Sequence, residues 1–254
     1  MEWSDEGVIV GTRRHGETGV ILEVMTQGRG RHLGLVRGGR SRRQRPVLQP
    51  GNRVGLIWRA RLEDHLGNFT VEPIELRAGE LLASALGLNA IQHLAALLRL
   101  LPERDPHPRL YDALLVVLDH IAEPTACGPL IVRFELELLN ELGFGLDLSR
   151  CAVTGAPQDL AYVSPRSGRA VGRDAGQPYH DKLLRLPSFL VPGERQPGSA
   201  ILPEEITQGF RLTGFFLNRH VWEARGLRVP EPRAGLIASL ERALGGAEAP
   251  PRII

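Results

Sequence analysis

Lysine is almost missing from this chain of 254 residues: Lys182 is the only one, against 30 arginines. This scarcity excludes a standard nucleotide-binding P-loop, because that motif needs a lysine directly after a glycine-rich loop and no such loop precedes Lys182. Long apolar runs are missing too, so no stretch of the sequence is predicted to span a membrane. Residues 1–6 are acidic, unlike the basic start of a secretory signal.

Cysteine is equally scarce, with Cys127 and Cys151 as its two copies. So low a count is typical of proteins in a reducing compartment, although the sequence leaves one disulfide open. Together with the missing signal and span, the cysteine count predicts a cytoplasmic protein.

Recognisable catalytic patterns are also missing. The sequence contains neither H-E-x-x-H nor G-x-S-x-G, and its eight histidines do not pair at metal-ligand spacing. Gly143-Phe144-Gly145 starts like a dinucleotide fingerprint but ends a predicted helix instead of opening one. Glu137 and Glu141 share a helix face, where a lone acid pair usually points into solvent. These absences predict a protein that is not an enzyme and has no cofactor and no metal site.

Charge is unevenly distributed, although the formal net charge is only +2. Residues 11–61 hold twelve arginines against two acids, Glu17 and Glu23, whereas residues 78–150 hold five arginines against ten acids. A basic segment joined to an acidic one is typical of a polyanion-binding module attached to a second functional part. The alternative is an ordinary fluctuation of charge along a solvated surface.

The first 77 residues have the pattern of short strands separated by turns. Strands are expected at 7–14, 20–26, 31–37, 53–62 and 69–76. Gly28 and Gly30 mark one turn, and Gly67 marks the last. Five strands of this length suit a small closed barrel of the OB-fold type, because closure removes exposed strand edges. A fragment of a β-sandwich is the main competing fold.

From Ala78 onward the hydrophobic period becomes helical. Helices are expected from Asn89, from 110 to 122, from 130 to 142, from 203 to before 226, and from 234 to 244. Gly143 can take the left-handed position that ends the third of these, with Phe144 folding back onto Leu139. The sequence thus predicts an α+β, multidomain chain. Its predicted parts are an OB-fold barrel over 1–77, an all-α domain over 78–246 that is irregular at 145–200, and a loose tail over 247–254.

Arginines crowd the loop between the third and fourth expected strands, and two more follow the first strand. The arginines predicted to bind DNA are Arg13, Arg14, Arg37, Arg40, Arg42, Arg43 and Arg45. OB folds bind oligonucleotides through their loops and one barrel face. Because Trp3, Trp58 and Phe69 are the only large aromatic residues nearby for stacking, we expect contacts mainly to phosphate, with strong salt dependence. The backbone of this loop is expected to be flexible. The alternative to DNA binding is a merely solvated basic loop.

A series of short motifs runs along the chain in a fixed order. The N-terminal motifs are Gly16-Glu17-Thr18, Ile21-Leu22-Glu23-Val24, Thr26 with Gly30, Arg37-Gly38-Gly39-Arg40 and Leu48-Gln49-Pro50-Gly51. The C-terminal motifs are Arg133-Phe134-Glu135-Leu136-Glu137-Leu138-Leu139, Leu142-Gly143-Phe144-Gly145, Leu148 and Cys151. The series resembles the RecO family of bacterial DNA repair and recombination proteins over nearly the whole chain, least well after residue 155.

The resemblance implies an OB-fold domain, a helical domain and the function of an adaptor, not of an enzyme. RecO proteins bind single- and double-stranded DNA, anneal complementary strands and bind RecR in the RecF pathway. They also bind the acidic C-terminal tail of single-strand-binding protein and help RecA load onto coated strands. For this chain the resemblance implies the same partners and a cytoplasmic, nucleoid-associated location. An OB-fold protein acting on RNA and a metal-dependent nucleic-acid enzyme with an unrecognised site are the alternatives.

One motif departs from the family. Many members carry a four-cysteine zinc knuckle that begins with C-x-x-C, but here Thr154 stands at the second position and no cysteine follows Cys151. Tetrahedral zinc needs four ligands, which Cys151 and the distant His180 do not supply. The sequence predicts a degenerate knuckle that binds no metal.

A site for the tail of single-strand-binding protein is predicted on the helix that begins near Leu130. An acidic tail with apolar end residues needs an apolar groove with a cation at its rim. Arg133 and the adjacent Phe134 are predicted to form this site. The alternative is that Arg133 pairs with Glu137 one turn on, which is the weaker orientation for a helical ion pair.

Overall fold

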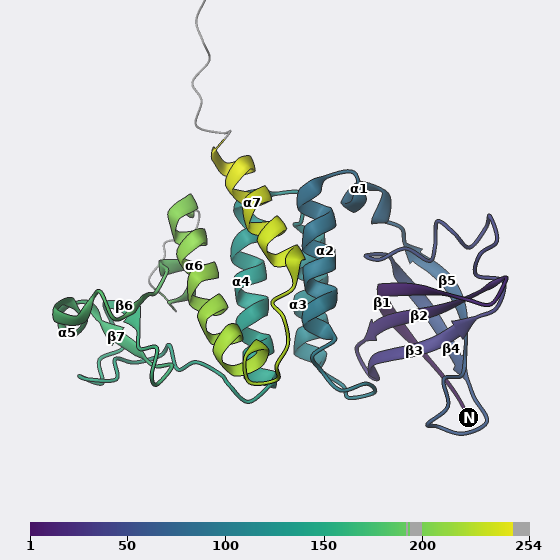
Figure 1. Cartoon of the computed structure of the whole chain (residues 1–254), viewed down its shortest axis with the longest axis horizontal. Helices are drawn as coiled ribbons and strands as arrows, with labels where there is room; N and C mark the ends of the chain where they lie inside the picture. Colours follow the sequence, from purple (N-terminus) through teal and green to yellow (C-terminus); the bar gives the residue numbers. More distant parts are fainter. Residues whose placement is uncertain (192, 194–199, 246–254) are drawn as a thin grey trace, which may run out of the picture. The chain divides into compact units, whose positions relative to one another are not determined.

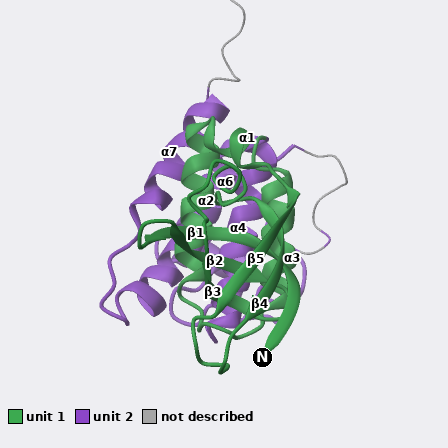
Figure 2. Cartoon of the chain, turned by 90° about the vertical axis from the view of Figure 1, so that its right-hand side faces the viewer, with its two compact units in different colours: residues 1–122 green, residues 123–254 purple. Residues whose placement is uncertain are grey.

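The computed structural model describes residues 1–191, 193 and 200–245 (Figure 1). Contacts divide the chain into two compact units, Met1–Ala122 and Glu123–Ile254, coloured separately in Figure 2. The predicted loose tail at 247–254 lies outside the described residues, as do residues 192 and 194–199 of the stretch expected to be irregular.

Unit 1 begins with five strands in the OB-type arrangement that the sequence predicts. They are β1 (Glu2–His15), β2 (Gly19–Thr26), β3 (Gly30–Val36), β4 (Arg53–Arg59) and β5 (Asn68–Glu75). Their order is β1-β2-β3-β5-β4, and β4 returns to pair with β1. Neighbours are antiparallel except β3 and β5, which are joined in parallel at one pair, Leu35 and Asn68. This order is that of a barrel and not of a sandwich fragment.

Alternating side chains explain why these segments form a barrel. Strands β3 and β4 alternate buried and half-buried residues, the pattern expected of strands with one face toward a core. Leu22 and Val24 of β2 belong to the barrel core. Ile21 and Met25, on the opposite face of β2, are buried as well. Strand β2 is therefore covered on both faces.

The connection between β3 and β4 packs against the barrel core. Its residues form successive turns, in which the Leu48 N–H donates to the Gln44 carbonyl at 2.9 Å. Val47 and Leu48 join the core cluster. The side-chain amide of the fully buried Asn52 donates to the carbonyls of Pro46 and Val47. Its side-chain oxygen accepts the Ala78 N–H at 2.9 Å. One side chain therefore fixes both this connection and the entry to the helices.

Three helices complete unit 1: α1 (Ala78–Leu82), α2 (Ala85–Leu98) and α3 (Pro108–Asp119). Helix α2 begins earlier than the predicted start at Asn89. Ser84 has the extended backbone of an N-cap and accepts the Gly87 N–H at 3.0 Å, whereas Asn89 already lies inside the helix. Helix α3 begins with Pro108 in its first turn, where a missing N–H is tolerated.

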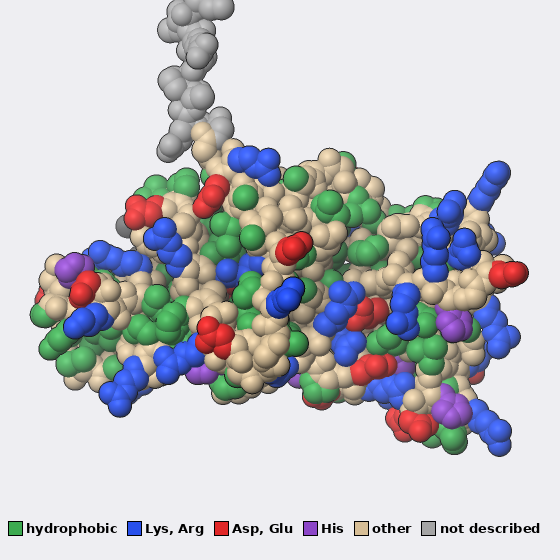
Figure 3. Space-filling view, in the orientation of Figure 1, with side chains coloured by type: hydrophobic (Ala, Val, Ile, Leu, Met, Phe, Trp, Pro, Cys, Tyr) green, Lys and Arg blue, Asp and Glu red, His purple; other side chains and the backbone are tan. Residues whose placement is uncertain are grey.

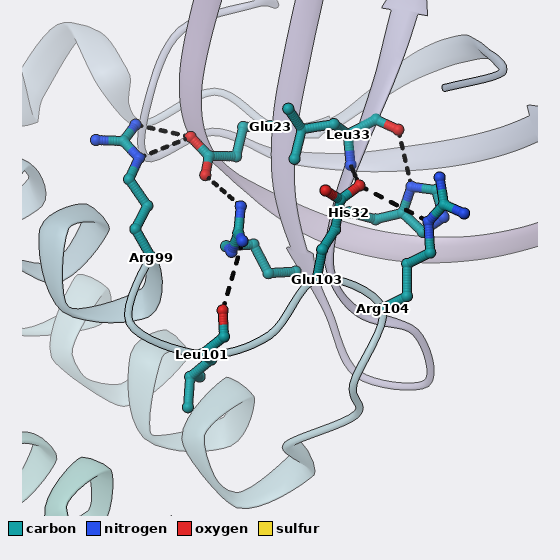
Figure 4. Close-up of polar contacts among 8 residues, drawn as sticks. Glu23, His32, Leu33, Arg99, Leu101, Glu103 and Arg104 are labelled. Carbon is teal, nitrogen blue, oxygen red and sulfur yellow. Dashed lines mark hydrogen bonds and ion pairs between the residues drawn. The ribbon is translucent and has the colours of Figure 1, made fainter. Parts of the chain in front are cut away.

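The segment after α2 runs along strand β3 (Figure 4). The Arg104 N–H donates to the Arg31 carbonyl at 2.8 Å, and the Leu33 N–H donates to the Glu103 carboxylate at 3.3 Å. An ion pair of 2.7 Å between Arg77 and Asp119 also joins the end of the barrel to α3. These contacts place the unit boundary at Ala122, whereas the sequence places the domain boundary at residue 77.

Unit 2 is built mainly from α4 (Pro124–Glu141), α6 (Pro203–Leu217) and α7 (Glu231–Gly245), with a π-helical turn, η3 (Asn218–Trp222), after α6. Helix α4 starts at Pro124, six residues before the predicted start at residue 130. A proline after residue 122 predicts the end of the preceding helix, but at the first position of α4 the fixed φ of Pro124 favours the helix that follows.

The predicted end of α4 is confirmed. Gly143 has a φ of +85°, its N–H donates to Asn140 at 3.0 Å, and the Phe144 N–H donates to the Leu139 carbonyl at 2.7 Å. This is the Schellman pattern. The ring of Phe144 stacks on His220, with centroids 4.8 Å apart. The helix end thus also contacts the turn after α6.

The stretch expected to be irregular contains a small sheet, so the prediction of an all-α second domain is wrong in this part. Strands β6 (Leu160–Val163), β7 (Ala170–Gly172) and β8 (Leu184–Arg185) pair in the order β7-β6-β8. Short helical turns surround them: α5 (Arg173–Gly176), η1 (Gln177–Tyr179) and η2 (Ser188–Leu190). Strands this short cannot show the alternation by which a strand is recognised in a sequence.

A buried ion pair joins the helices of unit 2. The Glu135 carboxylate on α4 is completely buried and receives the Arg233 guanidinium of α7 at 2.8 and 3.1 Å. The Thr213 hydroxyl of α6 donates to the same carboxylate. Three helices therefore meet at one acid. Among the residues that the structure describes, no helix is long and apolar enough to cross a membrane.

Candidate nucleic-acid interface

The seven arginines predicted to bind DNA are all exposed on unit 1. In the described part of the chain none of the seven forms an ion pair with an acidic side chain. Three other barrel arginines are paired: Arg31 with Glu23 at 3.0 Å, and Arg53 and Arg59 with acids of β1. Hereafter "the basic end" means these seven unpaired residues: Arg13, Arg14, Arg37, Arg40, Arg42, Arg43 and Arg45.

The fold brings the two groups of the basic end together. Arg40 donates its backbone N–H to the Thr18 carbonyl at 3.1 Å and its guanidinium to the Glu17 carbonyl at 2.6 Å. Glu17 and Thr18 form the turn between β1 and β2, and Arg13 and Arg14 stand just before that turn. The loop after β3 therefore lies against the hairpin that carries the other two arginines.

The loop is held in place, which corrects the expectation of a flexible backbone. Gly39 packs so closely that a Cβ there would lie 3.0 Å from both Val20 and Leu48. Arg37 donates its Nε to the Asn68 side chain at 3.1 Å, beside the pair that joins β3 to β5. Positive charge is thus presented from fixed backbone positions, so less backbone entropy is lost when a phosphate chain binds.

The neighbouring acid does not cancel this charge. Glu23 on β2 accepts the Arg31 guanidinium at 3.0 Å and the Arg99 guanidinium at 2.7 Å. Figure 4 shows Arg99 pointing toward this carboxylate. Its carboxylate is therefore neutralised by two cations of its own. Figure 3 shows Lys and Arg side chains projecting from the barrel, at the right of the view. The unpaired arginines can thus attract a polyanion without rearranging an internal ion pair.

The sequence names Trp3, Trp58 and Phe69 as rings of the barrel region but does not predict that they gather in one cluster. The indole of Trp3 stacks on that of Trp58 with centroids 5.7 Å apart, and His32 stands edge-on to Trp3 at 5.1 Å. These rings line a pocket of about 280 Å³ together with Arg29 and Arg104. The residues come from β1, β3, β4 and the segment after α2, so no local motif marks them.

The second predicted site, on α4, is partly corrected. Phe134 is 1% exposed and so offers no surface to a partner. Arg133 is exposed and lines a groove of about 510 Å³, whose apolar walls are Leu136, Leu146, Leu148, Phe189, Leu190 and Val191. Its guanidinium donates to the Phe189 carbonyl at 2.6 Å. The far wall, Phe189 to Val191, lies some fifty residues further along the chain. The periodicity of the α4 sequence therefore could not reveal it.

The loop around Cys151 keeps a compact turn. The Cys151 sulfur accepts the Gly172 N–H at 3.2 Å and the Thr154 N–H at 3.4 Å. Burial opposes ionisation of this thiol, but the hydrogen bonds to sulfur outweigh it and lower the pKa of Cys151 to about 7. In the described ranges no three His, Cys, Asp or Glu side chains lie close enough together to hold a metal ion.

Comparison with known proteins gives a consistent result over both units. A family described as "Recombination protein O N terminal" matches residues 1–77, and one described as "Recombination protein O C terminal" matches residues 86–227. A protein of Chelativorans named DNA repair protein RecO is 62% identical over 252 residues, which cover 99% of this chain and 100% of that protein. Its counterpart in Mesorhizobium japonicum is 60% identical over 95% of this chain and 94% of its own length.

Proposed function

The chain belongs to the RecO family of DNA repair proteins, and from that membership we propose that it is a recombination mediator and not an enzyme. The family supports a role in DNA repair and recombination. In the proposal the chain binds single- and double-stranded DNA, anneals complementary strands and, with RecR, helps RecA load in the nucleoid. The single observation that supports DNA binding most strongly is the basic end, with seven exposed arginines and no acidic partners in the described structure.

Annealing follows from the same chemistry. Two complementary strands repel each other through their phosphates, and a protein that neutralises phosphates without reading bases lowers that barrier for any sequence. Contacts to phosphate carry no sequence information, so one surface can serve single strands and duplexes.

The test is a salt titration of DNA binding by the wild type and by a triple variant, Arg40, Arg42 and Arg43→Glu. Each lost phosphate contact costs roughly 1 kcal/mol or more, and the slope of log K against log salt should shrink by about 0.7 per contact for single strands. Arg53→Glu serves as a control, because Arg53 is already paired with Glu6 at 2.5 Å. Equal affinity of wild type and triple variant at moderate salt would remove the basic end from the interface.

The annealing assay separates the proposal from its rivals. Complementary labelled strands should pair faster with the wild type than without protein, and more slowly with the triple variant. Strand cleavage in the presence of magnesium would favour a nuclease instead, and a marked preference for RNA over DNA of the same sequence would favour an RNA-binding adaptor.

We further propose that the groove at Arg133 binds the acidic tail of single-strand-binding protein. The groove offers apolar walls and the exposed Arg133, which suit a peptide that ends in apolar residues and a free carboxylate. Glu137 also lines it, so the carboxylate is expected to bind on the Arg133 side. One Arg133 nitrogen donates to the Phe189 carbonyl, so the tail would bind the remaining N–H groups of the guanidinium.

Two substitutions in the lining test the groove. Arg133→Ala should weaken binding of a labelled tail peptide by roughly 1–3 kcal/mol, as loss of a charge-assisted contact does. Leu148→Glu should weaken it as well, while leaving Arg133 and its bond to Phe189 in place. Arg211→Ala, on the exposed side of α6, is the control. Unchanged peptide affinity in both groove variants would exclude this site, and DNA binding should stay near that of the wild type throughout.

A further inference from the structure

The pocket on the barrel has the composition of a ring-binding site. We call it the indole pocket and define it by Trp3, His32, Trp58, Arg29 and Arg104. They line its volume of about 280 Å³ together with Met1, Glu2 and Glu63, and Glu2 is paired with Arg59 outside the pocket lining at 2.9 Å. Trp58 and His32 are 1% and 3% exposed, so they form the floor. Trp3 is only half-buried and is the ring that a ligand can reach.

Two guanidinium groups flank the rings. The Arg29 guanidinium carbon lies 5.6 Å from the centre of the Trp3 ring, and that of Arg104 lies 6.0 Å from the centre of Trp58. Arg104 is fixed, because it donates to the Glu63 carbonyl and, at 2.8 Å, to the His65 carbonyl. Arg29 stands exposed on the turn between β2 and β3. Arg29 can therefore move aside or follow a ligand, whereas Arg104 holds one wall.

His32 adds a defined hydrogen-bond acceptor. Its Nδ1 lies 2.9 Å from the Leu33 carbonyl, and since a carbonyl only accepts, Nδ1 carries the proton. Burial lowers the pKa of His32, which keeps the ring neutral. Nε2 is then an unprotonated nitrogen on a side chain that lines the pocket. It can accept a hydrogen bond from an amino group or a ring N–H.

We propose that the indole pocket holds one unstacked nucleobase of a bound single strand. A base presents a π-face to Trp3, N–H donors to His32 and a phosphate on its sugar to Arg29, so the rings and the exposed guanidinium each have a counterpart in one nucleotide. The proposal rests on the proposed DNA binding and adds a contact to a base where the basic end supplies contacts to phosphate. Paired bases in a duplex are stacked and cannot enter.

The pocket lies within reach of the basic end. His32 and Arg37 lie on and just after strand β3, five residues apart. At a rise of about 3.3 Å per residue this separation is about 17 Å, a distance that a few nucleotides of an extended strand can span. A strand that follows the arginines can therefore place one base in the indole pocket, and the pocket gives single strands an advantage over duplexes.

Fluorescence gives a direct readout. The chain has three tryptophans, and Trp222→Phe leaves Trp3 and Trp58 as the only emitters. The probes are an oligothymidylate and an abasic strand of equal length, which share the phosphates but differ in bases. We expect oligothymidylate to quench the indole emission and the abasic strand to bind with little quenching. Equal quenching by both strands would overturn the proposal.

Affinity supplies the second arm. Trp3→Ala should weaken oligothymidylate binding by about five- to a hundredfold, the range for loss of one base stack, and should leave duplex and abasic-strand binding unchanged. Trp3→Phe keeps a stacking ring and should restore most of the affinity, which separates stacking from misfolding. Tyr179→Ala removes an exposed ring of unit 2 and is the control.

The outcomes are distinguishable from failure of the proposed function. If the wild type binds neither probe, DNA binding itself is wrong. If it binds both probes equally well and Trp3→Ala changes neither affinity, phosphate binding stands and the indole pocket is excluded as a base site.

Discussion

At the scale of single residues, the two thiols of unit 2 show how strongly local surroundings set chemistry. Cys127 lies on α4 in an apolar setting, and burial raises its pKa to about 12. Cys151 is also buried, yet hydrogen bonds to its sulfur from the Thr154 side chain and from backbone N–H groups, those of Gly172 and Thr154 among them, lower its pKa to about 7. Hydrogen-bond donors of this kind stabilise a thiolate without a neighbouring cation.

This contrast leads to a testable titration. In a Cys127→Ser variant the ultraviolet absorbance of the thiolate should rise with a midpoint near pH 7, whereas in Cys151→Ser it should stay low until far more alkaline pH. The folded pKa of Cys151 lies below its ordinary value of 9.0, so its ionisation stabilises the fold fully above pH 9 and loses that effect as the pH falls through 7. Stability should thus rise from pH 7 to 9 in the wild type.

The control is Cys151→Ser, in which the rise in stability between pH 7 and 9 should disappear. Urea unfolding at several pH values measures both proteins. A wild type whose free energy of unfolding is flat over this range, or a thiol midpoint near 9, would contradict the role given to the hydrogen bonds at the Cys151 sulfur.

At the scale of elements, the buried acid on α4 determines how three helices are held together. The Glu135 carboxylate accepts hydrogen bonds from two nitrogens of Arg233 and from the Thr213 hydroxyl, and Arg233 also donates to the Phe210 carbonyl at 2.8 Å. Replacing one partner leaves the other charge buried without a counter-ion, which typically costs about 3–5 kcal/mol. Loss of either partner should therefore destabilise the packing of α7.

Arg233→Ala and Glu135→Gln should each lower the free energy of unfolding by about 3–5 kcal/mol in urea titrations. Arg242→Ala, on the exposed side of α7, should change it by less than about 0.5 kcal/mol and serves as the matched control. Losses below about 1 kcal/mol in both variants of the pair would show that α7 is held by other contacts.

The elements also show which features a sequence can reveal. Strands β1 to β5 were predictable because apolar residues alternate and glycines mark the turns, and the end of α4 was predictable from Gly143. The start of α4 was not, because Pro124 has opposite meanings inside a helix and at its first position. The sheet β7-β6-β8 was missed because its strands are only two to four residues long.

The candidate sites divide in the same way. The basic end could be predicted because most of its arginines are neighbours in one loop. The indole pocket could not, because Trp3, Trp58 and Arg104 meet only through the pairing of β1 with β4 and the path of the segment after α2. Phe134 was misplaced because a helix carries core and surface residues side by side, and only packing decides between them.

At the scale of the whole molecule, the contacts in unit 1 indicate where the chain can be cut. A fragment of residues 1–77 loses Arg99, Glu103 and Asp119, which bond to barrel residues, and it ends just before the N–H that Asn52 binds. We expect residues 1–122 to unfold cooperatively and to bind single strands, and residues 1–77 to be markedly less stable. Thermal unfolding and strand titration of both fragments measure this, and equal stability would place the boundary back at residue 77.

The path of the segment after α2 also has a consequence for the time course of folding. Strand β3 acquires its neighbour from residues 103 and 104 only after 70 further residues of chain, and β1 pairs Glu2 with Arg59. Contacts between such distant residues form slowly, because the chain loses the entropy of closing a long loop before the stabilising contacts are made. During synthesis the barrel cannot acquire its last edge contacts until more than a hundred residues have left the ribosome. The exposed edge of β3 is therefore the part of the nascent chain most in need of protection from mispairing.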